Sequence, residues 1–392
     1  MFLNKDYSNG KLILKNCNVA DTRNLRVIRN VDILLESGKI ATVSRFDSDS
    51  VDAQIISAAG HTVTPGLIDA HVHLCLSGEP NCHEKLDELG EEGLRAVMCE
   101  SLNLNLQNGI TTVRDLGSPW DMLVQLRQLE STDIAAPTVF AAGPVCTIPG
   151  GHAIFFGEVI YPPQTKDMFS KLTDFGADWV KLVGTGGNLS PTTQCDETQY
   201  SDKDFSAIVS AAADAGFDVA CHAHATEGIR QCLSYGVRSI EHGSYMSAEQ
   251  VSALSQMENC YWVTTTCPGR LIKNLSEAST DRVLRRRANI KLSVKEGAKL
   301  IAGTDAGIGG VPHGVLAYEI DEFIDGGMSA LKALRSATHL TAIMMRCEGK
   351  IGVIEDGADA DILLLKGDIE EDGFAFHDPA AIIKGGRLIK GL

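Results

Sequence analysis

Two histidines separated by one residue stand at the end of an apolar run near the start of the chain. The run covers residues 62–68, and Asp69, His71 and His73 follow it. Side chains alternate between the two faces of a β-strand, so both imidazoles point to the same side. Neutral imidazole nitrogens are common ligands of metals such as Zn²⁺. A catalytic metal needs more than two ligands, and later parts of the chain have to supply them.

Apolar runs of strand length recur through the middle of the chain and alternate with stretches of helical periodicity. After the run that ends at His71, they span residues 109–114, 138–142, 179–183, 218–221, 239–241, 261–264 and 300–303. Helical stretches between them include residues 203–215, 226–236 and 281–297. Eight βα units over about 250 residues predict an α/β fold of the (β/α)8 TIM-barrel type.

The two ends of the chain differ from the middle. Short strands joined by turns are predicted at residues 12–14, 31–35, 41–43, 360–365 and 382–389. We therefore expect a small β-sandwich-like domain built from both chain ends, residues 1–65 plus 350–392. Residues 66–349 would then form the catalytic barrel.

Polar residues end several of the predicted barrel strands, where the active sites of such barrels lie. Lys181 lies in the fourth strand, His222 and His224 end the fifth, His242 ends the sixth, and Asp305 follows the eighth. Each has an ordinary structural explanation: a hydrogen-bonded histidine, a lysine that reaches solvent, or an aspartate that caps a helix. Their placement at the ends of strands in one barrel favours a shared site instead.

With these residues in place, the chain resembles the amidohydrolase superfamily over nearly its whole length. The motifs that carry the resemblance are residues 65–73, Lys181, His222, His242, residues 304–307 and residues 352–361. A lysine on the fourth strand implies the two-metal subtype, in which CO2 carboxylates this lysine and the carbamate bridges two divalent ions. Carbamate formation requires the neutral amine, which burial and nearby cations favour because they lower its pKa.

The resemblance also implies a ligand set. It assigns His71, His73 and Asp305 to the more buried ion, His222 and His242 to the other, and Lys181 to both. Mixed nitrogen and oxygen ligation favours Zn²⁺, and Mn²⁺, Fe²⁺ or Co²⁺ would suit the same residues.

The expected activity is metal-dependent hydrolysis of an amide C–N bond. A hydroxide shared by the ions would attack the carbonyl, and Asp305 would move the proton to the leaving amine. Glycine-rich loops around residues 143–153 and 184–191 resemble the branch of Xaa-Pro dipeptidases and imidazolonepropionase-like enzymes, which favours a dipeptide or an N-acyl amino acid. A cyclic amide, lactone, carbamate or xenobiotic amide remains the alternative. A deaminase is less favoured, because that branch usually uses one metal ion and lacks the lysine on the fourth strand. A non-catalytic scaffold is also less favoured, because every ligand position is filled.

Three residues are candidates for contact with the substrate. His152 in the loop after the third strand is expected near the scissile group. His224 stands where dipeptidases of this branch commonly carry a tyrosine that contacts the substrate carboxylate, so we expect it farther out, over the pocket. Arg270, which follows the seventh strand, is a second candidate for binding an anion, and a surface arginine at a helix start is an equally simple interpretation.

Composition limits the partners of this 392-residue chain. A net charge of −16 and a pI of about 5.1 argue against nucleic acid and anionic membranes. The 11 cysteines include no CxxC pair, which indicates reduced thiols rather than a disulfide framework. Neither an apolar run of about 18 residues nor the start of a signal peptide is recognised, so a cytoplasmic location is expected. A homo-oligomer would agree with the resemblance, but the sequence indicates no interface.

Overall fold

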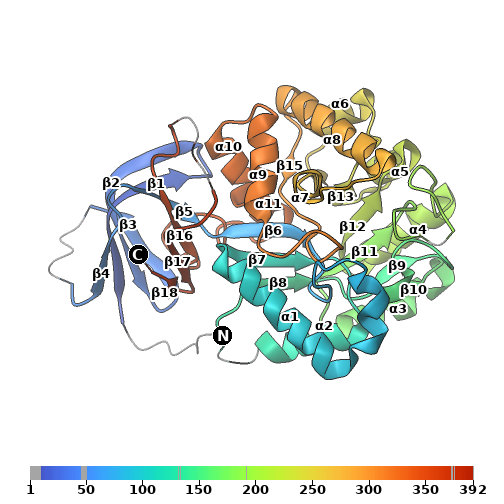
Figure 1. Cartoon of the computed structure of the whole chain (residues 1–392), viewed down its shortest axis with the longest axis horizontal. Helices are drawn as coiled ribbons and strands as arrows, with labels where there is room; N and C mark the ends of the chain where they lie inside the picture. Colours follow the sequence, from blue (N-terminus) through green and yellow to red (C-terminus); the bar gives the residue numbers. More distant parts are fainter. Residues whose placement is uncertain are drawn as a thin grey trace.

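The computed structural model contains a β-rich end and a larger body in which strands and helices alternate (Figure 1). It describes residues 10–45, 51–130, 132, 134–190, 192–371, 374 and 376–391. The β-rich end combines the N-terminal strands with the last strands of the chain (Figure 1).

Strands from both chain ends form a single eight-stranded sheet. Its order is β18-β17-β16-β5-β1-β2-β3, and β4 pairs with β1. The two ends of the chain meet where β5 and β16 pair in antiparallel register, from Pro65 opposite Ile362 to His61 opposite Lys366. The strands are β1 (Leu12–Asp21), β2 (Arg26–Glu36), β3 (Lys39–Ser44), β4 (Gln54–Ser57), β5 (His61–Pro65), β16 (Ile362–Lys366), β17 (Ala381–Lys384) and β18 (Arg387–Lys390).

This sheet has a hydrophobic core of its own. Leu14, Val19 and Ile33 from the N-terminal strands pack in it with Ile362 and Ile383 from the C-terminal strands, all fully buried. A shared core explains why segments so far apart in sequence pair with each other, because each strand buries one apolar face. The expected limits, residues 1–65 plus 350–392 and residues 66–349, stay a prediction.

The larger body contains two parallel sheets, ordered β6-β7-β8 and β10-β9-β11-β12-β13-β14-β15. All eight strands expected for this region are present, and β9 and β10 are additional. Most of these strands are buried along their whole length, as expected for parallel strands covered on both faces. The strands are β6 (Leu67–Val72), β7 (Ile110–Asp115), β8 (Thr138–Ala141), β9 (Val145–Thr147), β10 (Gly157–Val159), β11 (Trp179–Val183), β12 (Asp218–Ala223), β13 (Ser239–His242), β14 (Tyr261–Val263) and β15 (Leu300–Ile301).

Backbone contacts link the two parallel sheets at both margins. On one side, His73 N donates to Ala306 O over 2.8 Å, and Val72 forms a parallel bridge with Ala306. On the other side, Asp178 N donates to Ala141 O over 2.8 Å, next to the start of β11. The body is therefore an α/β structure with parallel strands, and its closure into a (β/α)8 barrel stays a prediction.

Helices separate most of the parallel strands, and some begin at clear capping residues. The stretches expected at 203–215, 226–236 and 281–297 correspond to α4, α5 and α8. Helix α8 begins four residues earlier than expected because Ser276 accepts a hydrogen bond from Ser279 N and caps it there. The helices are α1 (Gly90–Gln107), α2 (Trp120–Glu130), α3 (Thr165–Asp174), α4 (Asp202–Asp214), α5 (Thr226–Tyr235), α6 (Ala248–Gln256), α7 (Pro268–Leu271), α8 (Glu277–Glu296), α9 (Leu316–Asp325), α10 (Ala330–Ser336) and α11 (His339–Met344). Short 3-10 helices lie at Cys82–Glu88, Ile154–Phe156 and Pro162–Gln164.

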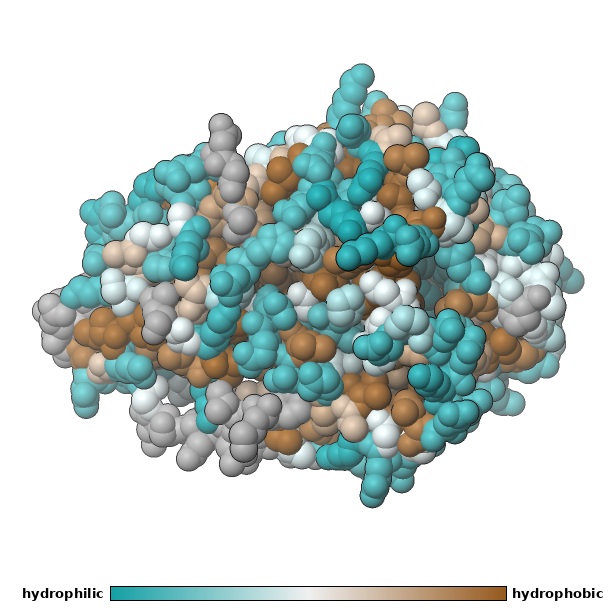
Figure 2. All heavy atoms as spheres, viewed as in Figure 1, coloured by the Kyte–Doolittle hydropathy of each residue, from teal (hydrophilic) through white to brown (hydrophobic). Residues whose placement is uncertain are grey.

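The molecular surface is mostly hydrophilic on the face shown in Figure 2, with smaller hydrophobic areas between the polar side chains. This agrees with the net charge of −16. None of the helices in the described part of the chain is long and apolar enough to cross a membrane.

Candidate metal centre

One cavity collects the polar residues that end the parallel strands. Its volume of about 130 Å³ suits a small organic molecule rather than a macromolecular segment. Eight of the nine predicted site residues line it, namely His71, His73, His152, Lys181, His222, His224, His242 and Asp305. Arg270 is the exception.

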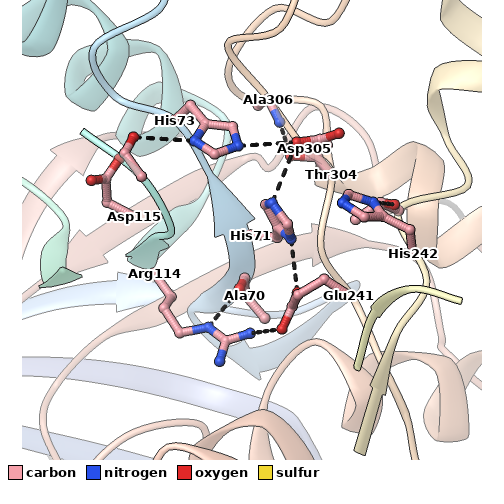
Figure 3. Close-up of polar contacts among 12 residues, drawn as sticks. Ala70, His71, His73, Arg114, Asp115, Glu241, His242, Thr304, Asp305 and Ala306 are labelled. Carbon is pink, nitrogen blue, oxygen red and sulfur yellow. Dashed lines mark hydrogen bonds and ion pairs between the residues drawn. The ribbon is translucent and has the colours of Figure 1, made fainter. Parts of the chain in front are cut away.

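The first group of potential ligands consists of His71, His73 and Asp305. The Nε2 atoms of His71 and His73 lie 3.4 and 3.3 Å from the same oxygen, Oδ1 of Asp305 (Figure 3). Asp305 has a φ of 62°, in the left-handed region that few non-glycine residues adopt. Such backbone strain is concentrated at functional sites. This turn after β15 presents the carboxylate to the two histidines at the end of β6.

The second group consists of His222, His224 and His242. The ring centroids of His222 and His242 are 4.7 Å apart, and His224 lies 4.7 and 4.9 Å from these two rings. His242 also has a left-handed φ, of 69°. We expected His224 farther out than a ligand, yet the structure places its ring within 4.9 Å of both other rings, which are themselves 4.7 Å apart.

The hydrogen bonds of four histidines fit metal binding, in which one ring nitrogen binds the ion and a protein group holds the other. His71 Nδ1 donates to Glu241 Oε2 over 2.7 Å, and His73 Nδ1 donates to the carbonyl oxygen of residue 117 over 3.2 Å. His222 Nε2 donates to the carbonyl oxygen of residue 186 over 3.1 Å. His242 Nδ1 lies 2.8 Å from the hydroxyl oxygen of residue 265. Each ring thus keeps one nitrogen for a ligand.

Burial keeps these histidines in the form that binds metal. It lowers the pKa of His71 to about 4, and with neighbouring charged groups it holds the pKa of His222 and His242 well below the usual range. Burial alone would raise the pKa of Asp305, but His71 and His73 outweigh it and hold this pKa well below its ordinary value. His71, His222 and His242 are therefore neutral imidazoles and Asp305 is an ionised carboxylate, the protonation states that metal ligands need.

Comparison with known proteins identifies the family. The sequence model of the amidohydrolase family matches residues 62–389. The chain belongs to the amidohydrolase family.

Three known proteins are similar to this amidohydrolase in sequence or in structure. The crystal structure of a Xaa-Pro dipeptidase with bound methionine superposes with a TM-score of 0.86 at 29% identity, covering 97% of this chain and 100% of that one. Imidazolonepropionase from Acidiphilium cryptum is 25% identical over 370 residues, 87% of each chain. Ochratoxinase from Aspergillus niger is 26% identical over 329 residues, which make up 73% of this chain and 66% of the fungal protein. This chain thus spans slightly less than two thirds of the fungal relative.

Lys181 of this amidohydrolase lies inside the cavity wall on β11. Its residue is 3% exposed, and among the described residues no hydrogen bond or ion pair is assigned to its amine. Burial lowers the pKa of Lys181 to about 8, and the positive charge of Arg114 also contributes. A larger neutral fraction at physiological pH is the state from which a carbamate forms.

A fully buried ion pair supports the first ligand group, and we did not anticipate it from the sequence. Arg114 Nη2 lies 3.0 Å from Glu241 Oε1, while the other oxygen of Glu241 accepts the hydrogen bond from His71 (Figure 3). Arg114 also donates to Ala70 O and stacks over the ring of Trp179. Charged residues inside two apolar strands are the signal that could have indicated this pair. The pair orients His71 and fixes which nitrogen faces the cavity.

His152 lies against the second ligand group. Its ring stacks on that of His222 at a centroid distance of 4.2 Å, and Gln199 Oε1 accepts a hydrogen bond from its backbone N–H. Its Nδ1 atom is buried without a hydrogen-bond partner among the described residues. Burial lowers the pKa of His152 to about 3, so the ring is neutral.

Arg270 does not line the cavity, which favours its interpretation as a surface arginine at a helix start over an anion-binding role. Its guanidinium pairs with Glu322 at 2.7 Å and Asp325 at 2.5 Å, both on α9, and these carboxylates hold it away from the ligand groups. Two other arginines, Arg282 and Arg286 on α8, line the cavity instead.

Proposed function

We propose that this amidohydrolase is a binuclear metal-dependent enzyme that hydrolyses an amide C–N bond of a dipeptide or an N-acyl amino acid. The observation that carries the proposal is the cavity, in which two groups of potential ligands lie around one buried lysine. Relatives named Xaa-Pro dipeptidase and imidazolonepropionase support hydrolysis of a C–N bond. The (β/α)8 barrel is the architecture that we propose for the two linked parallel sheets.

The proposed ligands divide between two ions, with Lys181 shared as a carbamate. His71, His73 and Asp305 would hold one ion, and His222 and His242 the other. When bound, two divalent ions, for which we propose Zn²⁺, lower the pKa of a water and polarise a carbonyl oxygen.

The chain's own residues would move the proton and stabilise charge. Asp305 is ionised and opens onto the cavity with 16% of its side chain exposed, so it can accept the proton of the attacking water. It would then return this proton to the leaving amine. His152 is a neutral buried ring with a free nitrogen, so it can donate a hydrogen bond to the developing oxyanion without adding a charge.

Lys181→Ala should bind at least one metal ion fewer per chain than the unchanged protein and lose activity, because the proposed carbamate would supply an oxygen to each ion. Added formate or acetate should restore part of the metal content and part of the activity, since a short carboxylate can occupy the space left by the carbamate. Metal content by mass spectrometry and hydrolysis rate are the measurements.

A matched control is Lys299→Ala. The Lys299 amine donates to the carbonyl oxygens of Met257 and Glu258, at 2.7 and 2.6 Å, and does not line the cavity. This variant should keep its full metal content. Full metal content and rate in Lys181→Ala would contradict the bridging role.

A substrate screen tests the reaction itself. The purified protein, loaded with Zn²⁺, would be assayed with dipeptides and N-acyl amino acids and, in parallel, with lactams, lactones and carbamates. We expect the highest kcat/KM for the first set. Preference for the second set would support the alternative of a cyclic or xenobiotic substrate. Absence of both bound metal and hydrolysis would indicate a non-catalytic scaffold.

A further inference from the structure

Two arginines of helix α8 lie buried in the wall of the catalytic cavity. Arg282 and Arg286 are four residues apart, so they occupy the same face of the helix, one turn from each other. They are 5% and 6% exposed, and both line the cavity. Their positive charges therefore face the space in which the substrate would bind.

Neither arginine has a carboxylate partner among the residues that the structure describes. Arg286 Nη1 donates to Ser244 Oγ over 2.9 Å, and its Nε atom is buried without a hydrogen-bond partner. Arg282 Nη2 donates to the neutral oxygens of Asn188 at 2.5 Å and Ser279 at 2.9 Å. A buried cation without a counter-ion is energetically costly, and burial lowers the pKa of Arg286 to about 10.

Neighbouring arginines that do not line the cavity have acidic partners. Arg285 pairs with Asp281 at 2.7 Å, while Arg287 and Arg270 both pair with Glu322 at 2.7 Å. The chain thus supplies carboxylates to the arginines around Arg282 and Arg286 and none to these two. This contrast indicates a counter-ion that comes from a ligand.

The other buried carboxylates near the cavity are engaged elsewhere. Asp305 faces His71 and His73. Glu319 accepts hydrogen bonds from the backbone N–H groups of Thr266 and Cys267, and burial raises its pKa to about 7, which favours the neutral form. Both favour the charged form of Arg286 at a distance, but neither forms an ion pair with an arginine that lines the cavity from α8.

A short chain of contacts connects Arg286 to the second ligand group. Ser244 Oγ accepts the hydrogen bond from Arg286 and lies 2.8 Å from His224 Nδ1. The ring of His224 in turn stacks on that of His242. An anion held by the arginines would therefore lie beside the proposed reaction centre.

We propose that Arg282 and Arg286 bind a carboxylate of the substrate, so that the enzyme selects anionic amides and rejects their neutral counterparts. This inference rests on the proposed function. The carboxylate belongs to the leaving amino acid in a dipeptide or an N-acetyl amino acid, or to the acyl group in an N-succinyl amine. Guanidinium groups suit this role because they bind carboxylates with paired, charge-assisted hydrogen bonds.

Paired substrates test the proposal on the Zn²⁺-loaded enzyme. N-acetyl-L-amino acids are compared with their carboxamides, and N-succinyl amines with N-butyryl amines of the same length. We expect the acid of at least one pair to be cleaved with a kcat/KM higher by roughly 30-fold or more, the scale for loss of one member of a buried charge pair. In Arg286→Gln and Arg282→Gln this preference should collapse through a higher KM for the acid, and the kcat/KM for the neutral substrate should change much less than that for the acid. Arg286→Lys should restore part of the preference.

Arg285→Gln is the matched control, because this residue lies on the same helix and pairs with Asp281 outside the cavity. It should leave the preference unchanged. The Tm of the ligand-free Arg286→Gln variant should equal or exceed that of the unchanged protein, since an unpaired buried charge is removed. A lower Tm with an unchanged acid preference would mean that Arg286 is structural, and would overturn the proposal.

A binding measurement separates failure of this proposal from failure of the proposed function. If the acid and the carboxamide are cleaved with equal kcat/KM, the proposed anion site is wrong and the proposed hydrolase activity is still supported. If no amide is cleaved, calorimetry with N-acetyl-L-amino acids still tests the site. If the unchanged protein binds the N-acetyl-L-amino acid and Arg286→Gln does not, the anion site is supported without the hydrolase activity. Equal binding by the two proteins would overturn the anion site.

Discussion

Asp305→Asn is expected to lower kcat by roughly 10²- to 10⁴-fold, the usual contribution of a positioned acid–base group. An amide keeps the size of the side chain and one ligand oxygen, but it cannot accept a proton from the attacking water. The pKa of Asp305 lies below its ordinary value, so the carboxylate is ionised at neutral pH. Steady-state kinetics combined with metal analysis of the same sample measure the effect.

Asp218→Asn is a suitable control for this variant. Asp218 lies at the beginning of β12, at the opposite end of the strand from His222, and pairs with Arg346 at 2.6 Å. Its loss should leave kcat unchanged. Near-normal turnover by Asp305→Asn with both metal ions bound would refute the role of Asp305 as proton shuttle.

Arg114→Met should lower the free energy of unfolding by about 3–5 kcal/mol, because it leaves the Glu241 carboxylate buried without its cation. Both side chains are fully buried, and Arg114 also donates to Ala70 O at 2.7 Å and Ser239 Oγ at 3.0 Å. Urea denaturation with the metal removed by a chelator measures the change, since bound metal would add its own stabilisation.

The double variant Arg114→Met/Glu241→Gln separates stability from metal binding. Removal of both charges should recover part of the lost stability, because no uncompensated ion remains. His71 nevertheless loses its charged acceptor, so metal affinity should stay lower by about 10- to 100-fold. Arg346→Met breaks the more exposed pair with Asp218 and should cost less than about 1 kcal/mol. A similar small loss in Arg114→Met would show that the buried pair contributes little.

The sequence predicted the site best where potential metal ligands stand at the ends of strands. His71, His222 and His242 lie at the ends of buried strands whose apolar runs could be recognised locally. The positive φ of His242 and of Asp305 could not be predicted, because it depends on contacts with neighbouring segments. The positions of these histidines at strand ends therefore indicated that they meet in one site, and the structure adds the orientation of each imidazole ring.

The arginines were harder to place because their roles depend on helix orientation and on distant partners. Arg285, Arg286 and Arg287 are adjacent in sequence, and only the rotation of α8 about its axis decides which of them faces the cavity. Arg270 follows a strand end as an active-site residue would, but α9 supplies it with two carboxylates. Arg114 and Glu241 each stand out as a charge inside an apolar strand, but their strands are far apart in sequence, so no local pattern shows that they pair with each other.

The pairing of β5 with β16 has a consequence for synthesis on the ribosome. These strands are separated by about 300 residues, so at 5–20 residues per second β5 emerges roughly 15–60 s before its partner. During this interval the nascent chain carries a strand edge whose partner has not been translated, and such edges pair readily with other chains. A prematurely terminated product that lacks β16 would keep this edge permanently. Translation to the final strands thus protects the protein from aggregation as well as completing its sheet.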